Sequence, residues 1–205
     1  MLQFVILGLT FGASAGLSPG PLQTLVISAT LRHNLKEGIK TAFAPLMTDG
    51  PVVLISILIL SQLSEVNWIL GTISFCGGLF LIYLGYESFK SGHVEIGNQV
   101  EKPKSIQKAI VTNFLSPNPY IFWFSVGAPT FVNAFKISGV TASLFLVAFY
   151  VTIISSFLLT AFLVSRFRHL LQGKLYTYTM RFLGLSLILF SVLFFRNGLK
   201  FWGIL

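Results

Sequence analysis

The chain has 205 residues, of which 54% are hydrophobic and only 10% are charged, and its mean hydropathy is +0.82. Soluble domains carry roughly a quarter charged residues, so this composition excludes a soluble globular protein and indicates a polytopic membrane protein. The formal net charge of +8 does not indicate nucleic-acid binding, because the basic residues fall in short segments between apolar runs. A single cysteine, Cys76, excludes a disulfide framework and two-thiol redox chemistry.

Six apolar runs are each long enough to span a bilayer, which takes roughly 20 helical residues. They cover about Leu2–Leu31, Ile39–Leu63, Trp68–Phe89, Ile110–Ala134, Thr141–Val164 and Tyr176–Phe201. Six spans leave no room for a soluble domain, so we expect one all-α transmembrane domain over residues 1–205. We expect two half-repeats, 1–90 and 108–205, joined by a polar cytoplasmic linker at 91–107.

The first span contains a Ser-Pro-x-Pro motif deep inside it. The motif comprises Ser18, Pro19, Gly20 and Pro21. Two prolines that bracket one residue cannot lie in a continuous helix, because each removes a backbone donor and clashes with the preceding turn. Thirty helical residues would also extend about 45 Å, whereas the hydrocarbon core is about 30 Å thick. We therefore predict two half-helices, with Gln23 near the start of the second, where free N–H groups suit a carboxylate.

Asp49 lies near the centre of the second span, after Thr48 and before Gly50 and Pro51. A carboxylate at this depth costs about 3 kcal/mol or more unless it is paired, hydrated or protonated, and ionisable groups there usually mark a transport pathway. Two interpretations stay open. Asp49 either receives a substrate amine or a proton, or it is a protonated side chain that ties together irregular backbone.

The fourth span carries a second motif of the same pattern. It comprises Ser116, Pro117, Asn118 and Pro119. At 1.5 Å per helical residue, both motifs lie roughly 14–16 Å from the basic residues that mark the inner surface. Asn113 precedes the second motif by one turn, and Asn113 and Asn118 either bind a ligand or satisfy carbonyls that the prolines free. Trp123 either lines a cavity there or packs in the core. Paired breaks at matching places in two halves indicate a transporter's substrate site.

The lysines and arginines predict the orientation. They gather after the first, third and fifth spans, whereas Lys136, Arg196 and Lys200 lie on the other side. By the positive-inside rule, the basic connections face the cytoplasm and both termini face the outside, with anionic lipid as a partner. Three spans per half force opposite orientations, so we expect two inverted three-helix repeats with helices one and four broken. The basic group comprises Arg32, Lys36, Lys40, Lys90, Lys102, Lys104, Lys108, Arg166, Arg168 and Lys174.

Four segments carry a resemblance to a known family. They are Gly12-x-x-x-Gly16-x-x-Pro19-Gly20-Pro21, Gly38 with Asp49 eleven residues later, Tyr83-Leu84-Gly85-Tyr86, and Asn113-Phe114-Leu115-Ser116-Pro117 with Pro129-x-Phe131. Over nearly its whole length the chain resembles the LysE/RhtB-type amino-acid exporters of the LysE superfamily. It departs from them at Ser116-Pro117, where that family usually has Asn-Pro, and at Pro45 and Thr48, where that family often has Gly.

The resemblance implies a secondary transporter rather than an enzyme. It implies export of amino acids or related small amphiphiles across the plasma membrane of a prokaryote, coupled to protons. No cofactor is expected, and no metal site, because His33, His93 and His169 lack ligand spacing. Two alternatives stay open: a divalent-metal or other small-solute exporter of the same superfamily, and a non-transport membrane scaffold. The sequence leaves the amino acid and the oligomeric state open, and a homo-oligomer is compatible with it.

Overall fold

The computed structural model describes residues 1–59, 66–91, 103–168 and 174–205, and every regular element in these ranges is a helix. The elements are α1 (Leu2–Leu17), α2 (Pro21–Arg32), α3 (Leu35–Ala42), α4 (Ala44–Ile59), α5 (Val66–Ser91), α6 (Ser105–Phe114), α7 (Pro117–Phe122), the π-helical turn η1 (Trp123–Gly127), α8 (Ala128–Ile137), α9 (Gly139–Phe167) and α10 (Lys174–Phe201). Within these ranges, α5, α9 and α10 are long and apolar enough to cross a membrane, and the bent pair α1–α2 makes a fourth candidate span. This confirms the prediction of an all-helical protein with several candidate membrane spans.

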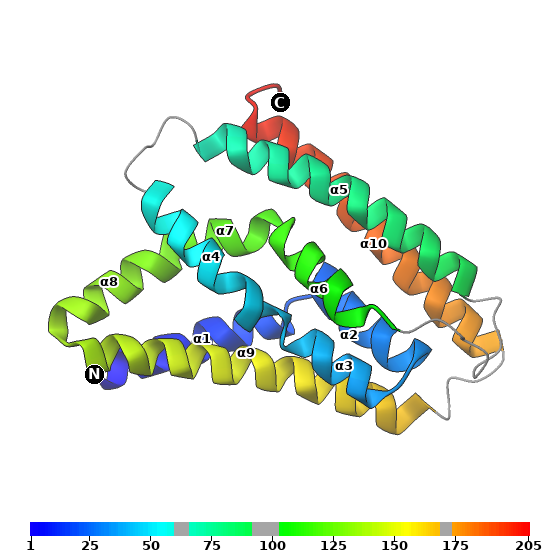
Figure 1. The fold of residues 1–205 in the computed structure, drawn as a ribbon, viewed down its shortest axis with the longest axis horizontal. Helices are drawn as coiled ribbons and strands as arrows, with labels where there is room; N and C mark the ends of the chain where they lie inside the picture. The colour runs from blue at the N-terminus through cyan, green and yellow to red at the C-terminus, as the bar shows by residue number, and fades with distance from the viewer. Residues whose placement is uncertain (60–65, 92–102, 169–173) are drawn as a thin grey trace.

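Two long helix pairs lie along opposite sides of the molecule. Figure 1 shows α1 beside α9 at the bottom and α5 beside α10 at the top, with α4, α6, α7 and α8 between them. In the first pair, the space beside each α1 glycine is closed by an α9 carbonyl. The facing residues are Gly8 with Phe145, Gly12 with Phe149, and Gly16 with Ile153. Both series advance by four residues in the same direction, so α1 and α9 run parallel.

The second pair is antiparallel. Gly198 of α10 approaches the carbonyl oxygen of Gly71, and Gly184 approaches that of Gly85, so the contact moves backward along α10 as α5 advances. An added Cβ would lie 3.1 Å from that oxygen at Gly198 and 2.9 Å at Gly184. Small residues at such interfaces let membrane helices approach closely and pack through their backbones.

The outward face of α9 is apolar. Val147, Val151 and Phe162 are exposed on the side opposite α1. A helix that is apolar on both faces suits either a large core or a membrane, and here the exposed face has no protein against it in the described part of the chain. Such a face is compatible with the interior of a membrane.

The helical backbone is interrupted at both predicted motifs. The axes of α1 and α2 meet at a bend of 62°. Ser18 has φ −64° and ψ 129°, and Ser116 has φ −83° and ψ 130°. Both serines precede a proline, whose ring disfavours the helical region for the residue before it, so both adopt extended backbone. The same local cause produces the same geometry in two distant segments.

The two interruptions differ in where the helix resumes. In the first, α2 begins at the second proline, Pro21, whereas in the second, α7 begins at the first proline, Pro117. Asn118 and Pro119 therefore lie inside a helix. Tyr120 of α7 donates a hydrogen bond of 3.0 Å from its hydroxyl to the carbonyl of Phe114, which supplies a side-chain partner for backbone next to the break.

Other boundaries differ from the predicted ones. The second predicted span is divided at Phe43 into α3 and α4, just before Ala44, which precedes Pro45. Residues 60–63 of that span and 92–102 of the predicted linker lie outside the described residues. The linker was expected to reach residue 107, but α6 already begins at Ser105.

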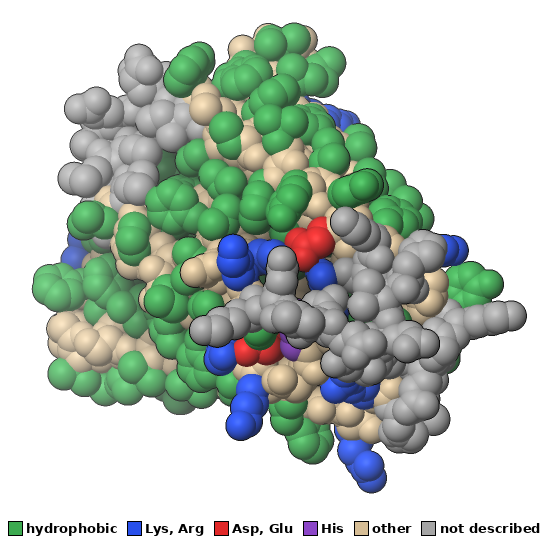
Figure 2. All heavy atoms as spheres, turned by 45° about the vertical axis from the view of Figure 1, so that its right-hand side comes forward, with side chains coloured by type: hydrophobic (Ala, Val, Ile, Leu, Met, Phe, Trp, Pro, Cys, Tyr) green, Lys and Arg blue, Asp and Glu red, His purple; other side chains and the backbone are tan. Residues whose placement is uncertain are grey.

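Charged side chains gather at one end of the molecule. Figure 2 shows basic, acidic and His side chains close together on the face that comes forward, beside a largely hydrophobic surface. There, Glu87 accepts hydrogen bonds from Arg32 at 3.1 Å and from Lys108 at 2.5 Å. One carboxylate thus joins α2, α5 and α6.

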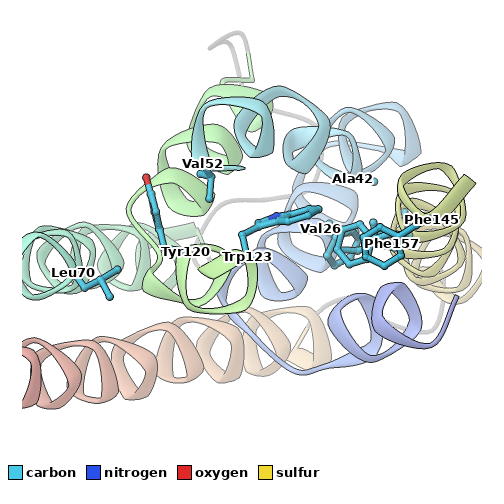
Figure 3. Packing of buried hydrophobic residues seen from close by; sticks show 11 residues of the cluster. Val26, Ala42, Val52, Leu70, Tyr120, Trp123, Phe145 and Phe157 are labelled. Carbon is cyan, nitrogen blue, oxygen red and sulfur yellow. The ribbon is translucent and has the colours of Figure 1, made fainter. Parts of the chain in front are cut away.

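The main hydrophobic core lies where the interrupted segments meet α9. Trp123 is 1% exposed and lies between α4 and α9 (Figure 3). The buried members of this core are Val26, Ala42, Val52, Leu70, Tyr120, Trp123, Phe145, Phe149, Ile153, Phe157 and Ala161. This packing holds the irregular backbone against α9, a continuous helix of 29 residues.

Candidate functional site

A cavity of about 450 Å³ lies where both interruptions meet α4 and α9. Its volume falls in the range of pockets that hold small ligands. Ten of the eleven residues predicted for the site line it. They are Ser18, Pro19, Gly20, Pro21, Gln23, Asp49, Asn113, Ser116, Asn118 and Pro119. Pro117, the eleventh, is buried and does not line the cavity.

Asp49 is the one ionisable side chain among the described residues that line the cavity. It is 4% exposed. Its Oδ2 accepts hydrogen bonds from Trp123 Nε1 and from the Tyr150 hydroxyl, both at 3.3 Å. Its Oδ1 faces Asn113 Nδ2 at 3.4 Å and Thr48 Oγ1 at 3.5 Å. These four neutral donors come from α4, α6, η1 and α9, so the carboxylate joins four elements.

Neutral donors surround Asp49 without compensating its charge. Its four contacts are at the long end of hydrogen-bond geometry, whereas Asn113 Nδ2 lies 2.6 Å from Thr48 Oγ1. Among the described residues, no Lys, Arg or His lies within ion-pair distance of Asp49. A hydrogen bond from a cationic donor to a carboxylate is shorter and stronger than these contacts. The arrangement therefore suits a carboxylate that takes up a cation or a proton.

Two further polar groups in the lining have no protein partner among the described residues. They are the side-chain carbonyl oxygen of Gln23 and the hydroxyl of Thr112, both buried. Gln23 donates from Nε2 to Thr160 Oγ1 at 2.9 Å, which fixes its amide on α9. A buried polar group without a partner costs about 1–3 kcal/mol. Both groups are therefore candidate ligand contacts.

The start of α2 lies in the same lining. Gly20, Pro21, Leu22 and Gln23 all contribute to it, and no side chain caps the first turn of α2. The first N–H groups of a helix lack partners within the helix and carry a partial positive charge. The lining thus has an electropositive part in addition to the Asp49 carboxylate.

Aromatic rings form one wall of the cavity. Phe122 stacks on Phe149 with ring centroids 5.2 Å apart and meets Phe11 edge-on at 5.9 Å. Trp123 packs against Phe149 at 5.4 Å. Ile153 of α9 extends the wall. The indole of Trp123 therefore belongs to the apolar wall and also donates to Asp49.

Sequence reasoning missed Thr112 in this lining and also missed Tyr150, which contacts Asp49 without lining the cavity. Both interpretations of Trp123 hold, since it is a core residue and lines the cavity. Tyr150 and Thr112 were not predicted. Tyr150 is a hydroxyl-bearing side chain within the apolar run of the fifth span, a weak signal that could have marked it. Thr112 carried no signal beyond its place beside Asn113.

Comparison with known proteins identifies the family. The family model of the LysE type translocator matches residues 13–198, which include both interruptions, Asp49, Trp123 and Tyr150. No curated protein and no solved structure matches the chain. Because the matched segment covers most of the 205 residues, the chain belongs to the LysE type translocator family.

Proposed function

We propose that the protein is a proton-coupled exporter of amino acids or related small amphiphiles in the plasma membrane of a prokaryote. Family membership indicates a membrane exporter of small solutes. One observation carries the finer proposal: an uncompensated carboxylate, Asp49, lines the same cavity as two interrupted helices. Transporters bind their substrates at such interruptions near the membrane centre.

The cavity suits the two charges of an amino acid. The ammonium group would replace the long neutral contacts of Asp49 with a short, charge-assisted bond. The carboxylate would lie at the uncapped start of α2, where N–H groups and the helix dipole favour an anion. The unpaired Thr112 hydroxyl is a further donor for it. An amino acid would thus satisfy groups that the protein leaves without partners.

Asp49 also suits proton coupling. If a proton and the substrate ammonium group compete for this carboxylate, influx of one proton can drive efflux of one zwitterion. A charge that crosses the membrane gains about 2.3 kcal/mol per 100 mV of potential, which supports a steep substrate gradient. The carboxylate must be empty, protonated or substrate-bound in turn, so its neutral surroundings are an advantage.

The helix directions support six spans in two inverted repeats. In that topology, spans one and five run parallel and spans three and six run antiparallel. The glycine contacts of α1 with α9 and of α5 with α10 have these directions. Reporter fusions at Leu205 and within residues 91–107 should give opposite readouts, with the C-terminus outside. Equal readouts would contradict the six-span topology.

A counterflow screen in proteoliposomes tests the function. Vesicles are loaded with one unlabelled compound at a time (an amino acid, a divalent metal or another small solute), and uptake of the same labelled compound is measured against protein-free vesicles. We expect exchange of at least one amino acid. Exchange only of divalent metals or other solutes would support the superfamily alternative, and exchange of no solute would support a membrane scaffold.

A further inference from the structure

We infer that the cavity selects α-amino acids with an uncharged, apolar side chain and rejects those with a charged one. This inference rests on the proposed function and names the substrate class of the same site. The observation behind it is that a single carboxylate, Asp49, lies directly beside the aromatic wall, because Trp123 contacts both.

The charge of the lining limits the charge of the substrate. Among the described residues that line the cavity, Asp49 is the one ionisable side chain. A lysine substrate would bring two cationic groups to this single carboxylate. A glutamate substrate would bring a second carboxylate where the described lining holds no Lys, Arg or His. Either side-chain charge would be buried without a partner, which is strongly unfavourable in a membrane interior.

The apolar wall adjoins the carboxylate. Trp123 donates to Asp49 and packs against Phe149, so the wall begins beside the anionic group. An α-amino acid carries its side chain on the carbon that bears the ammonium nitrogen. With that nitrogen at Asp49, the side chain would therefore lie on the wall. Substrates with a long spacer between amine and apolar group would not reach both.

The wall favours substrates with an apolar side chain and offers few partners to a substrate hydroxyl group. Apart from Trp123, its members Phe11, Phe122, Phe149 and Ile153 come from α1, α7 and α9 and have no polar side-chain atom, and the same holds for Phe157, which also lines the cavity. Burial of each apolar group there is favourable, whereas a polar side chain loses its hydration without compensation. The volume of about 450 Å³ leaves room for large side chains.

A substrate panel tests the selection. Counterflow of leucine, phenylalanine, serine, lysine and glutamate is measured in proteoliposomes that contain the full-length protein. We expect leucine and phenylalanine to exchange about tenfold or more faster than lysine and glutamate, with serine between. Lysine or glutamate exchanging as fast as leucine would overturn the inference but leave amino-acid export intact. A panel without any exchange would instead contradict the proposed function, and this inference with it.

A pair of variants with side chains of nearly the same shape but different charge sharpens the test. Val126 of η1 also lines the cavity and is 38% exposed. Val126→Glu adds a second carboxylate, and Val126→Gln adds a side chain of nearly the same shape without the charge. We expect the lysine-to-leucine exchange ratio to rise about tenfold in the Glu variant and not in the Gln variant. Equal ratios in two folded variants would overturn the inference, and if either variant does not fold, the wild-type panel decides.

Discussion

The indole Nε1 of Trp123 lies 3.3 Å from Oδ2 of Asp49 and donates a hydrogen bond to it, although 74 positions separate the two residues in the chain. Trp123 begins the π-helical turn η1, directly after α7, whose first turn contains Pro117 and Pro119. A π-helical turn changes the direction of the side chains that follow it and is frequent at functional sites. The irregular part of the fourth predicted span, α7 and η1, therefore supplies Phe122 and Trp123 to the aromatic wall and a hydrogen-bond donor to the Asp49 carboxylate.

The Trp123→Phe variant should slow transport. The substitution keeps an aromatic ring in the wall but removes one of the two donors to Oδ2, and the loss of a long hydrogen bond of this kind corresponds to about 1 kcal/mol. We expect counterflow rates about fivefold lower. Tyr150→Phe removes the other donor and serves as the matched variant. If both variants transport at the wild-type rate, the donors do not position Asp49 for transport.

The Asp49→Asn variant should fold but lose proton-driven efflux. The amide keeps the shape of the carboxylate and removes the charge that would attract an ammonium group or a proton. Efflux against a concentration gradient, driven by an imposed proton gradient, should fall to the level of protein-free vesicles. Thermal unfolding of the purified variant controls for folding. Undiminished efflux would show that Asp49 only ties helices together.

The Gly12→Ala variant should destabilise the α1–α9 pair. An added Cβ would lie 2.5 Å from the backbone oxygen of Phe149, which cannot turn away as a side chain could. We expect a loss of about 1–3 kcal/mol in the free energy of unfolding, seen as a lower midpoint of thermal unfolding in detergent. Gly50→Ala is the control, because nothing lies within 4 Å of its added Cβ. That variant should be unchanged or up to about 1 kcal/mol more stable. Equal destabilisation of both would contradict the close α1–α9 contact.

The Glu87→Gln variant should weaken the charged end of the molecule. It leaves the Arg32 and Lys108 cations, 13% and 26% exposed, without the carboxylate between them. We expect a loss of about 1–3 kcal/mol in the free energy of unfolding. Glu37→Gln is the comparison: the Glu37 side chain is 6% exposed, but its partner Lys40 is 58% exposed and stays hydrated without the carboxylate, so we expect a loss of at most about 1 kcal/mol. An effect at Glu87 no larger than at Glu37 would show that the three-helix contact adds no stability.

The sequence predicted the features that arise from local chemistry. The prolines at 18–21 and 116–119 interrupt their helices wherever the chain folds, because a proline ring acts on the residue before it and on the preceding turn. The apolar composition and the spacing of the glycines on α1 can also be read from the sequence alone. The prediction of a shared cavity used one further premise, that matching breaks in two halves of a transporter meet.

The division of the second predicted span at Phe43, the π-helical turn and the partners of Asp49 appear only in the tertiary structure. Tyr150 is 101 positions from Asp49, and Asn113 is 64 positions from it. The sequence by itself determined that this is an apolar, helical membrane protein with two broken helices and one carboxylate deep inside. Only packing decided which side chains surround that carboxylate, because contacts between helices depend on register and close approach at residues such as Gly12, which no local preference fixes.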